Sequence, residues 1–421
     1  MILYIAIAAA TVLAAVIVNR EEGSPGGSRG ALLQSSCLFL IALILIVPAV
    51  LRQETGNDYL RYVEFFHLAS IDAYVPTEAG FNLLAKVVYR LCGYENYLLL
   101  FGIYAVLTIL LMLLALRQQA EDYALSFFLF MMFGYYFQSF NTMRYYFALS
   151  IALVALTCLL RRRYLSFVLL IGIAALFHKT ALVTLILYPL TLVRWRKIHV
   201  AAATVLGGLT LLFHDKVLQL LLVLYPSWEG TGDLAAGTSV SWVNIAKCAA
   251  VLALALLVRR WNHTEMTERP TADGMSVKIT TPLNPQEMET GVPQPGCGAQ
   301  MKTPTQARED EQKIRQLRVY WNSTLFGLGL YVFGWFVPEI SRICYYLTFS
   351  QVFLIPMLLH RIPENEKGTR RRKVLTGLVL LAGMLYFAMF LKTAYRDTIK
   401  LLPYKSFLFH ELNQTPSGSV G

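Results

Sequence analysis

The chain has 421 residues, of which 56% are hydrophobic and only 15% are charged, and its formal net charge is +11. A soluble domain carries about a quarter charged residues, whereas many apolar runs here reach the roughly 17–25 residues that cross a bilayer as a helix. The composition therefore excludes a soluble globular enzyme and predicts an all-α, polytopic integral membrane protein. We interpret the positive charge as a bias among the loops rather than as affinity for nucleic acid.

The first part of the chain contains five predicted spans and one long polar segment. The spans are Ile2–Val18, Ala31–Leu51, Tyr97–Leu116, Tyr123–Gln138 and Met143–Leu160. Between the second and third spans lies Arg52–Asn96, whose apolar residues follow an amphipathic rather than a spanning pattern. We expect this segment, residues 52–96, to lie on the outer face of the membrane.

A short hairpin is predicted around His178. About thirty residues separate the basic clusters Arg161–Arg163 and Arg194–Lys197, and His178-Lys179 interrupts them. If both clusters are cytoplasmic, the chain goes out and returns through two helices of about 15 residues, each near 22 Å long at 1.5 Å per residue. Such helices are too short for an untilted crossing, so we expect a locally thinned or re-entrant hairpin with His178 at its outer apex.

The rest of the chain supplies five more spans and a polar insert. The spans are Ile198–Phe213, Trp242–Val258, Val319–Val337, Ile343–Leu359 and Val374–Leu391. The segment Trp261–Gln316 is rich in Pro, Thr and Gly and has no periodicity before residue 305. It predicts a disordered cytoplasmic loop that ends in a charged helical stub, Arg308–Arg318.

About 12 transmembrane helices follow from this reading, with both termini outside. The predicted divisions are an N-terminal bundle over residues 1–260, the loop over 261–316, and a C-terminal bundle with an outer tail over 317–421. This orientation puts the basic loops Arg161–Arg163 and Arg370–Lys373 in the cytoplasm, as the positive-inside rule expects.

Two arginines stand in tight turns on the outer side. Asn141 and Arg144 are three residues apart in the turn between the fourth and fifth spans, so they share one face at a helix start. An arginine held near hydrocarbon is costly without an anionic partner, and its planar fork of donors suits phosphate. The alternative is an arginine that snorkels at a helix end. Arg342 repeats the arrangement, with Glu339 as a possible partner.

Three further side chains are candidates for acid–base chemistry. Asp58, four residues before Tyr62, and Glu78 each stand near a predicted helix start, so each is either a helix N-cap or a site carboxylate. His178 is either a packing residue or a general base or phosphate donor, because its ordinary pKa is near neutrality. The six cysteines form no CxxC or Cys/His cluster, so we expect no disulfide framework and no thiolate metal site.

The motifs in chain order are Gly56-Asn57-Asp58-Tyr59 with Tyr62, Glu78-Ala79-Gly80-Phe81, Ser139-Phe140-Asn141 with Arg144, Phe177-His178-Lys179-Thr180, Ser341-Arg342 with Tyr345-Tyr346, and Pro403-Tyr404-Lys405. This ordered set resembles the EpsG family of bacterial Wzy-like polymerases of exopolysaccharide and capsule. The resemblance runs over residues 1–260 and 317–410. The chain departs from the family pattern at Tyr145, commonly Gln, and at Ala79, commonly Pro, and the insert 261–316 has no counterpart in the resemblance.

The resemblance implies a multi-pass protein of the bacterial cell (inner) membrane that extends a surface polysaccharide. It transfers a growing glycan from polyprenyl pyrophosphate to a hydroxyl of a lipid-linked repeat unit at the outer face. Asp58, Glu78 and His178 are the candidates for the base. The expected substrate-binding residues are Arg144, Arg342, Asn141, Tyr62 and Lys179.

We expect no cofactor and no metal, since no pair of outward carboxylates is spaced to hold one. The expected partners are the bilayer, the lipid-linked oligosaccharide and other polysaccharide-export components. The alternative is a flippase or transporter of lipid-linked oligosaccharide without covalent chemistry. A transporter places its charged groups near the bilayer midplane, often in paired repeats, whereas here they gather at the outer face and no repeat is visible.

Overall fold

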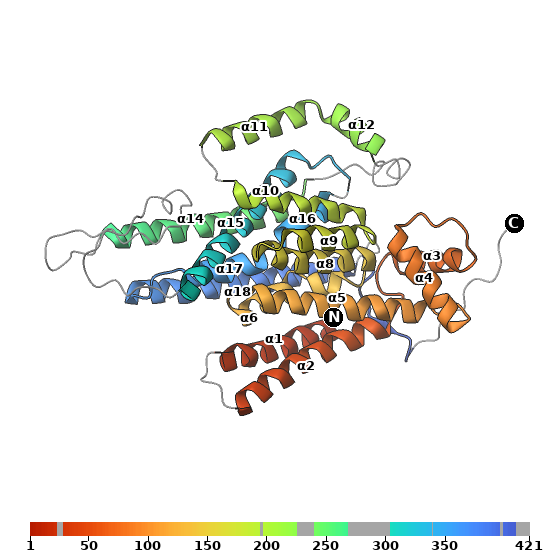
Figure 1. Ribbon diagram of the computed structural model, residues 1–421. Coiled ribbons are helices and arrows are strands. Elements are labelled where there is room, and N and C mark those ends of the chain that lie inside the picture. The colour runs from red at the N-terminus through yellow and green to blue at the C-terminus, as the bar shows by residue number, and fades with distance from the viewer. Residues whose placement is uncertain are drawn as a thin grey trace. The chain divides into compact units, whose positions relative to one another are not determined.

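The computed structural model describes residues 1–22, 28–193, 197–224, 240–267, 304–338, 340–395 and 399–409, and these are almost wholly helical (Figure 1). The chain folds as two compact units. The first unit comprises Met1–Leu159, Arg163–Leu182 and Thr376–Gly421, and the second comprises Leu160–Arg162 and Val183–Leu375. The division predicted from hydropathy, at residues 260 and 317, stays a prediction.

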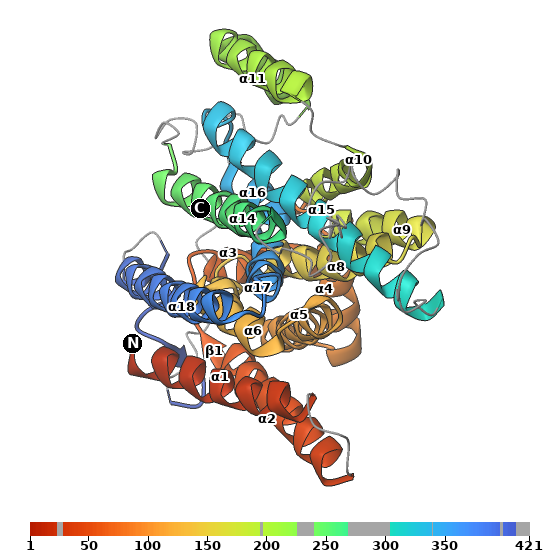
Figure 2. The same ribbon diagram turned by 90° about the vertical axis from the view of Figure 1, so that its left-hand side faces the viewer.

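The first unit is built from these helices: α1 (Ile2–Glu22), α2 (Ser28–Leu51), α3 (Tyr59–Ser70), α4 (Ala79–Cys92), α5 (Tyr97–Gln119), α6 (Tyr123–Met132), α7 (Tyr135–Gln138), α8 (Met143–Leu160), α9 (Tyr164–Ala175) and the later part of α18 (Glu366–Ala394). Helices α1 and α2 lie side by side (Figure 2). The short helices α3 and α4 lie together at the start of α5 (Figure 1). Asn96 and Asp122 fix the starts of α5 and α6, because each side chain accepts a hydrogen bond from a backbone N–H three residues on.

The second unit contains α10 (Leu187–Leu192), α11 (Lys197–Leu212), α12 (His214–Leu224), α14 (Trp242–Thr267), α15 (Pro304–Phe333), α16 (Ile340–Thr348) and α17 (Gln351–His360). Helix α15 packs against α14 and α16. The Asn322 amide on α15 donates hydrogen bonds to the carbonyls of Leu190 (2.7 Å) and Val193 (3.1 Å), which would otherwise be left open at the end of α10. Helices α11 and α12 meet at a bend of 83°.

Seven helices in the described part of the chain are long and apolar enough to span a membrane, or eight if the bent pair α11–α12 is one span. They correspond to eight of the predicted spans. The other predicted spans fall on the shorter apolar helices Tyr123–Met132, Tyr164–Ala175 and Lys179–Leu192 and on the last part of α15. The chain is thus a multi-pass membrane protein, and the count of about twelve stays a prediction.

Three details of the prediction were wrong. The fourth predicted span is broken at Gly134, which takes a left-handed φ of +75° between α6 and α7. The second arm of the hairpin begins as a 3-10 helix, Lys179–Ile186, and becomes α-helical only in α10. Helix α14 extends to Thr267, into the start of the insert predicted to be disordered, whereas the predicted charged helical stub Arg308–Arg318 is confirmed as part of one continuous α15. Residues 268–303 of that insert lie outside the described residues.

The segment 399–409 returns to the loop that follows α2. Strand β1 (Arg52–Gln53) pairs antiparallel with β2 (Lys405–Ser406). The Lys405 ammonium lies 2.9 Å from the Glu54 carboxylate, and the Tyr404 hydroxyl donates to the Pro48 carbonyl at 2.9 Å. We call this segment the C-terminal strap. It fixes the loop that leads into the first of the predicted site motifs.

Candidate functional site

Four of the predicted motifs meet in the first unit. They are the loop before α3, the start of α4, the turn before α8 and the segment after α9. Gly80 N–H donates to the Leu176 carbonyl at 2.8 Å, and Asn57 N–H donates to the Asn141 side-chain oxygen at 2.6 Å. Each of these two pairs of segments is therefore joined by a hydrogen bond from a backbone N–H, which limits how far the functional side chains can move apart.

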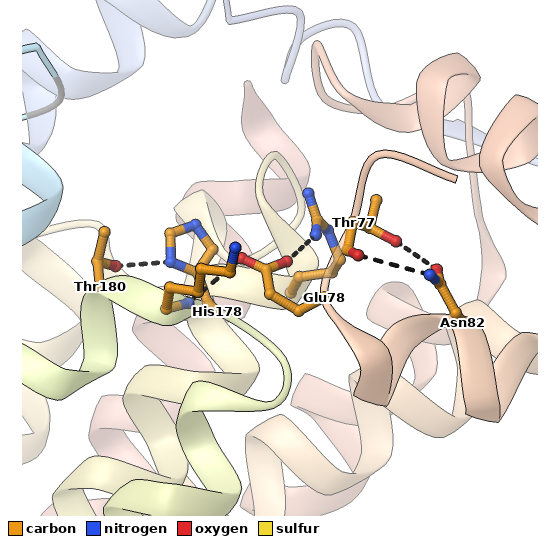
Figure 3. A network of polar contacts seen from close by, with 7 residues as sticks. Thr77, Glu78, Asn82, His178 and Thr180 are labelled. Carbon is orange, nitrogen blue, oxygen red and sulfur yellow. Dashed lines mark hydrogen bonds and ion pairs between the residues drawn. The ribbon is translucent and has the colours of Figure 1, made fainter. Parts of the chain in front are cut away.

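Glu78 connects three of these motifs. One carboxylate oxygen pairs with the Arg144 guanidinium, and the other accepts a hydrogen bond from the Lys179 backbone N–H at 3.2 Å (Figure 3). The side chains of Glu78 and Arg144 are only 15% and 16% exposed. The anionic partner that the sequence argument demanded for Arg144 is thus supplied by the protein itself.

The capping interpretation was wrong for both acids. Asp58 and Glu78 stand at the N-cap positions of α3 and α4, yet neither side chain makes a cap hydrogen bond. At the start of α4, Thr77 hydrogen-bonds instead with the Asn82 side chain (Figure 3). The Glu78 carboxylate is thereby left to face the turn and the His178 segment.

Two glycines allow the segments to approach so closely. Gly56 has a left-handed φ of +97°, and a Cβ there would lie 2.5 Å from the Phe140 carbonyl oxygen. A Cβ on Gly80 would lie 2.7 Å from the Leu176 carbonyl oxygen. Atoms of a real side chain essentially never come this close, so both positions require glycine. The sequence motifs around Gly56 and Gly80 are therefore contacts between segments as well as helix starts.

Asn141 holds the site together. Its side-chain oxygen accepts the hydrogen bond from Asn57 N–H, so Asn141 positions the loop before α3. Whether its amide group also reaches a substrate, as predicted, stays a prediction.

The Arg144 guanidinium lies over aromatic rings. Its carbon is 5.5 Å from the Tyr62 ring centroid and 5.7 Å from the Phe81 ring centroid. Both rings are buried, and aromatic faces attract a cation most strongly where water is excluded. The rings and Glu78 fix the orientation of the arginine fork, while its Nε has no hydrogen-bond partner among the described residues.

His178 lies beside the ion pair, in the segment whose next backbone N–H holds Glu78. Its Nδ1 is 2.6 Å from the Thr180 hydroxyl oxygen (Figure 3), and its ring packs edge-on against Tyr145 with centroids 5.3 Å apart. The side chain is half-buried, and the neighbouring Lys179 is exposed. The contact with Thr180 and the packing against Tyr145 fix the orientation of the imidazole ring beside the ion pair.

Arg342 belongs to the second unit, in the first turn of α16, and is half-buried there. Its suggested partner Glu339 lies outside the described residues. Asp58, Tyr62, Glu78, Asn141, Arg144, His178 and Lys179 all belong to the first unit. The structure thus groups seven of the eight predicted site residues within one compact unit.

One buried arginine was not predicted. Arg52 is 3% exposed and lies 5.3 Å from the Phe140 ring centroid and 6.0 Å from that of Phe101. Its position as the first charged residue after the second predicted span was a signal that could have identified it.

No group of three or more His, Cys, Asp or Glu side chains in the described ranges is arranged to hold a metal ion. Independence from metal stays a prediction.

Comparison with protein families gives one match, to the EpsG family, over residues 36–284 and 293–406. The match covers most of the insert 261–316, where the resemblance of the motifs had suggested no counterpart. No curated protein and no solved structure matches the chain. Because the family match covers well over half of the sequence and includes all the residues of the site described above, the chain belongs to the EpsG family.

Proposed function

We propose that this protein polymerises a bacterial surface polysaccharide. It transfers a growing glycan from polyprenyl pyrophosphate to a hydroxyl of a lipid-linked repeat unit at the outer face of the cell membrane. Membership of the EpsG family supports a polymerase-type enzyme of polysaccharide biosynthesis, working in a membrane on a lipid-linked oligosaccharide. The observation that carries the finer proposal is the shielded Glu78–Arg144 pair with His178 next to it.

The transfer makes one bond and breaks one. The acceptor oxygen bonds to the anomeric carbon of the growing glycan, while the bond from that carbon to the pyrophosphate oxygen breaks. The bonding electrons leave with the pyrophosphate, and the acceptor proton passes to a base. The protein must therefore stabilise negative charge on a leaving phosphate and accept a proton nearby.

Arg144 is suited to the first task. Preorganised donors aimed at developing negative charge act most strongly where water is excluded, and this guanidinium is fixed by Glu78 and two rings. One of its nitrogens pairs with Glu78 and it also hydrogen-bonds to Tyr62, but its Nε has no partner among the described residues, so donors remain to meet a phosphate oxygen. Lys179, exposed beside the pair, adds a second positive charge. Phosphate binding by Arg342 stays a prediction.

His178 is the best candidate for the second task. Both Glu78 oxygens already accept hydrogen bonds, one from Arg144 and one from Lys179 N–H, so this carboxylate is engaged in holding the segments together. We therefore assign Glu78 a positioning role. Asp58 stays an alternative base, since its side chain is not used to cap α3.

One experiment separates polymerase from flippase. In the source bacterium, deletion of the gene should remove long glycan and cause single repeat units to accumulate on the carrier lipid in the outer leaflet. An impermeant glycosidase applied to intact spheroplasts should then digest those repeat units. Accumulation in the inner leaflet, protected from the glycosidase, would instead identify a flippase and contradict the proposal.

A further inference from the structure

Arg52 is a buried charge without a countercharge among the described residues. Its nearest acid in sequence, Glu54, is paired with Lys405 at 2.9 Å. The only hydrogen-bond acceptor that it meets is the Met143 sulfur, at 4.0 Å, and its Nε has no partner. Burial lowers the pKa of Arg52, and the groups that oppose this effect are tyrosines. An arginine remains charged even so, and a buried unpaired charge is strongly unfavourable.

A second buried donor lies next to it. The Tyr59 side chain is 4% exposed, and its hydroxyl proton has no acceptor within the part of the chain that the structure describes, although the Glu54 backbone N–H approaches the hydroxyl oxygen. Tyr59 and Arg52 both pack against the Phe101 ring, at 4.9 Å and 6.0 Å. Buried polar groups are nearly always hydrogen-bonded. Two adjacent donors that lack an acceptor are therefore the arrangement that an incoming anion would complete.

The same place borders the candidate site. Arg52 contacts Phe140 and Met143, which belong to the same turn as Arg144. Tyr62 interacts electrostatically with both arginines. Of the two arginines, only Arg144 has a carboxylate partner in the described ranges.

We propose that the Arg52 guanidinium and the Tyr59 hydroxyl form a second anion-binding point of this site, which takes one phosphate group of a lipid-linked diphosphate. The choice of a diphosphate rests on the proposed function. Two phosphates joined by one bridging oxygen need two sets of donors, and Arg144 and Arg52 provide one each. Met143 covers Arg52 with a flexible thioether, a weak acceptor that a phosphate oxygen replaces readily.

The test measures binding and thermal stability of the full chain in lipid nanodiscs. The probe is farnesyl diphosphate, with farnesol to control for the prenyl chain and inorganic pyrophosphate to detect binding of the free anion. The variants are Arg52→Met and Tyr59→Phe. The matched control is Tyr123→Phe, since Tyr123 also has a buried hydroxyl without a partner among the described residues and also lies by an arginine, Arg117. Arg117 is about 24 Å from Phe101 along α5.

We expect Arg52→Met to bind farnesyl diphosphate about 10- to 100-fold more weakly, as loss of charge-assisted hydrogen bonds predicts. Its thermal midpoint should be unchanged or higher, because an apolar side chain replaces an unpaired buried charge. Tyr59→Phe should weaken binding several-fold at equal or higher stability, and Tyr123→Phe should leave binding unchanged. Inorganic pyrophosphate should bind more weakly than the lipid-linked probe but show the same order among variants.

Two results would overturn the inference and leave the proposed function intact. One is that wild type and both variants bind the probe equally. The other is that Arg52→Met loses binding together with a large fall in thermal midpoint, which identifies a structural role. If Arg52→Met does not fold, Tyr59→Phe decides, and an unchanged affinity overturns the inference. Failure of the wild type to bind farnesyl diphosphate would reject the diphosphate donor, and with it both proposals.

Discussion

Glu78 and Arg144 form an ion pair between residues 66 positions apart, with 15% and 16% of their side chains exposed. A pair so shielded is a unit, because removal of one partner leaves the other as a poorly solvated charge. The pair also joins the start of α4 to the start of α8. Substitution of either residue is thus expected to remove the contribution of both.

A double-mutant cycle tests this dependence. Glu78→Gln and Arg144→Lys should each lower glycan extension about 10²–10³-fold, the typical cost of losing one preorganised donor. The double variant should lose no more than the worse single variant, because the interaction is already absent. The measurement is the ladder of glycan lengths at matched protein level in the membrane. Multiplied losses in the double variant would show that the two residues act independently.

Arg342 requires its own comparison. If it binds a phosphate through its planar fork, Arg342→Lys should severely shorten the glycan, because lysine keeps the charge but loses bidentate geometry. Arg117→Lys is the matched control, an exposed arginine in the last turn of α5 where lysine should snorkel equally well. Normal long polymer in Arg342→Lys would mark Arg342 as an anchor.

His178 is tested against the residue that orients it. His178→Gln should lower extension about 10²–10⁴-fold if the imidazole takes the acceptor proton. Thr180→Val removes only the partner of Nδ1, so we expect a loss of about tenfold and a changed pH–rate profile. The rates are measured across pH in membrane vesicles. A pH profile in Thr180→Val that is identical to wild type would argue against a catalytic imidazole.

Glycine substitutions test the closeness of the segments. Gly56→Ala places a Cβ 2.5 Å from the Phe140 carbonyl oxygen at a φ of +97°, so we expect a loss of stability of about 2–5 kcal/mol. Gly93→Ala has a similar φ of +74° but open space, and should cost about 1–2 kcal/mol. Gly208→Ala, in a helix with nothing within 4 Å, should be neutral or slightly stabilising. Thermal midpoints in detergent should follow that order, and any other order would contradict the packing.

Sidedness is tested by labelling. In a variant without the six natural cysteines, a cysteine at Lys179 should react with an impermeant maleimide on intact cells. A cysteine at Thr281 should react only after permeabilisation. Labelling of position 281 on intact cells would overturn the orientation derived from the basic loops.

Hydropathy predicted the long helices well, because a membrane span depends on the local composition of about 20 residues. It failed where the conformation of one residue ends a helix, as at Gly134, whose left-handed backbone separates α6 from α7. It also missed the last turns of α14, residues 261–267, because this polar stretch carries no apolar signal.

Candidate site residues could be proposed from the sequence, but their hydrogen-bond and ion-pair partners could not. Glu78 was expected to be either a cap or a carboxylate of the site, and only the structure shows that its two oxygens join Arg144 and Lys179. Such contacts depend on distances between segments far apart in the chain, which no periodicity reports. Arg52 was missed for the same reason, since its importance comes from the acceptors it does not meet in the described part of the chain.

The C-terminal strap has a consequence for biosynthesis. Gly56 N–H donates to the Lys400 carbonyl at 2.9 Å, and β1 pairs with β2, so the loop beside the Arg144 turn is secured by residues synthesised more than 340 positions later. Helices α1 to α9 are synthesised first, but this loop lacks these contacts until residues 399–406 have left the ribosome. A nascent chain therefore lacks the contacts that secure this loop during nearly all of its synthesis.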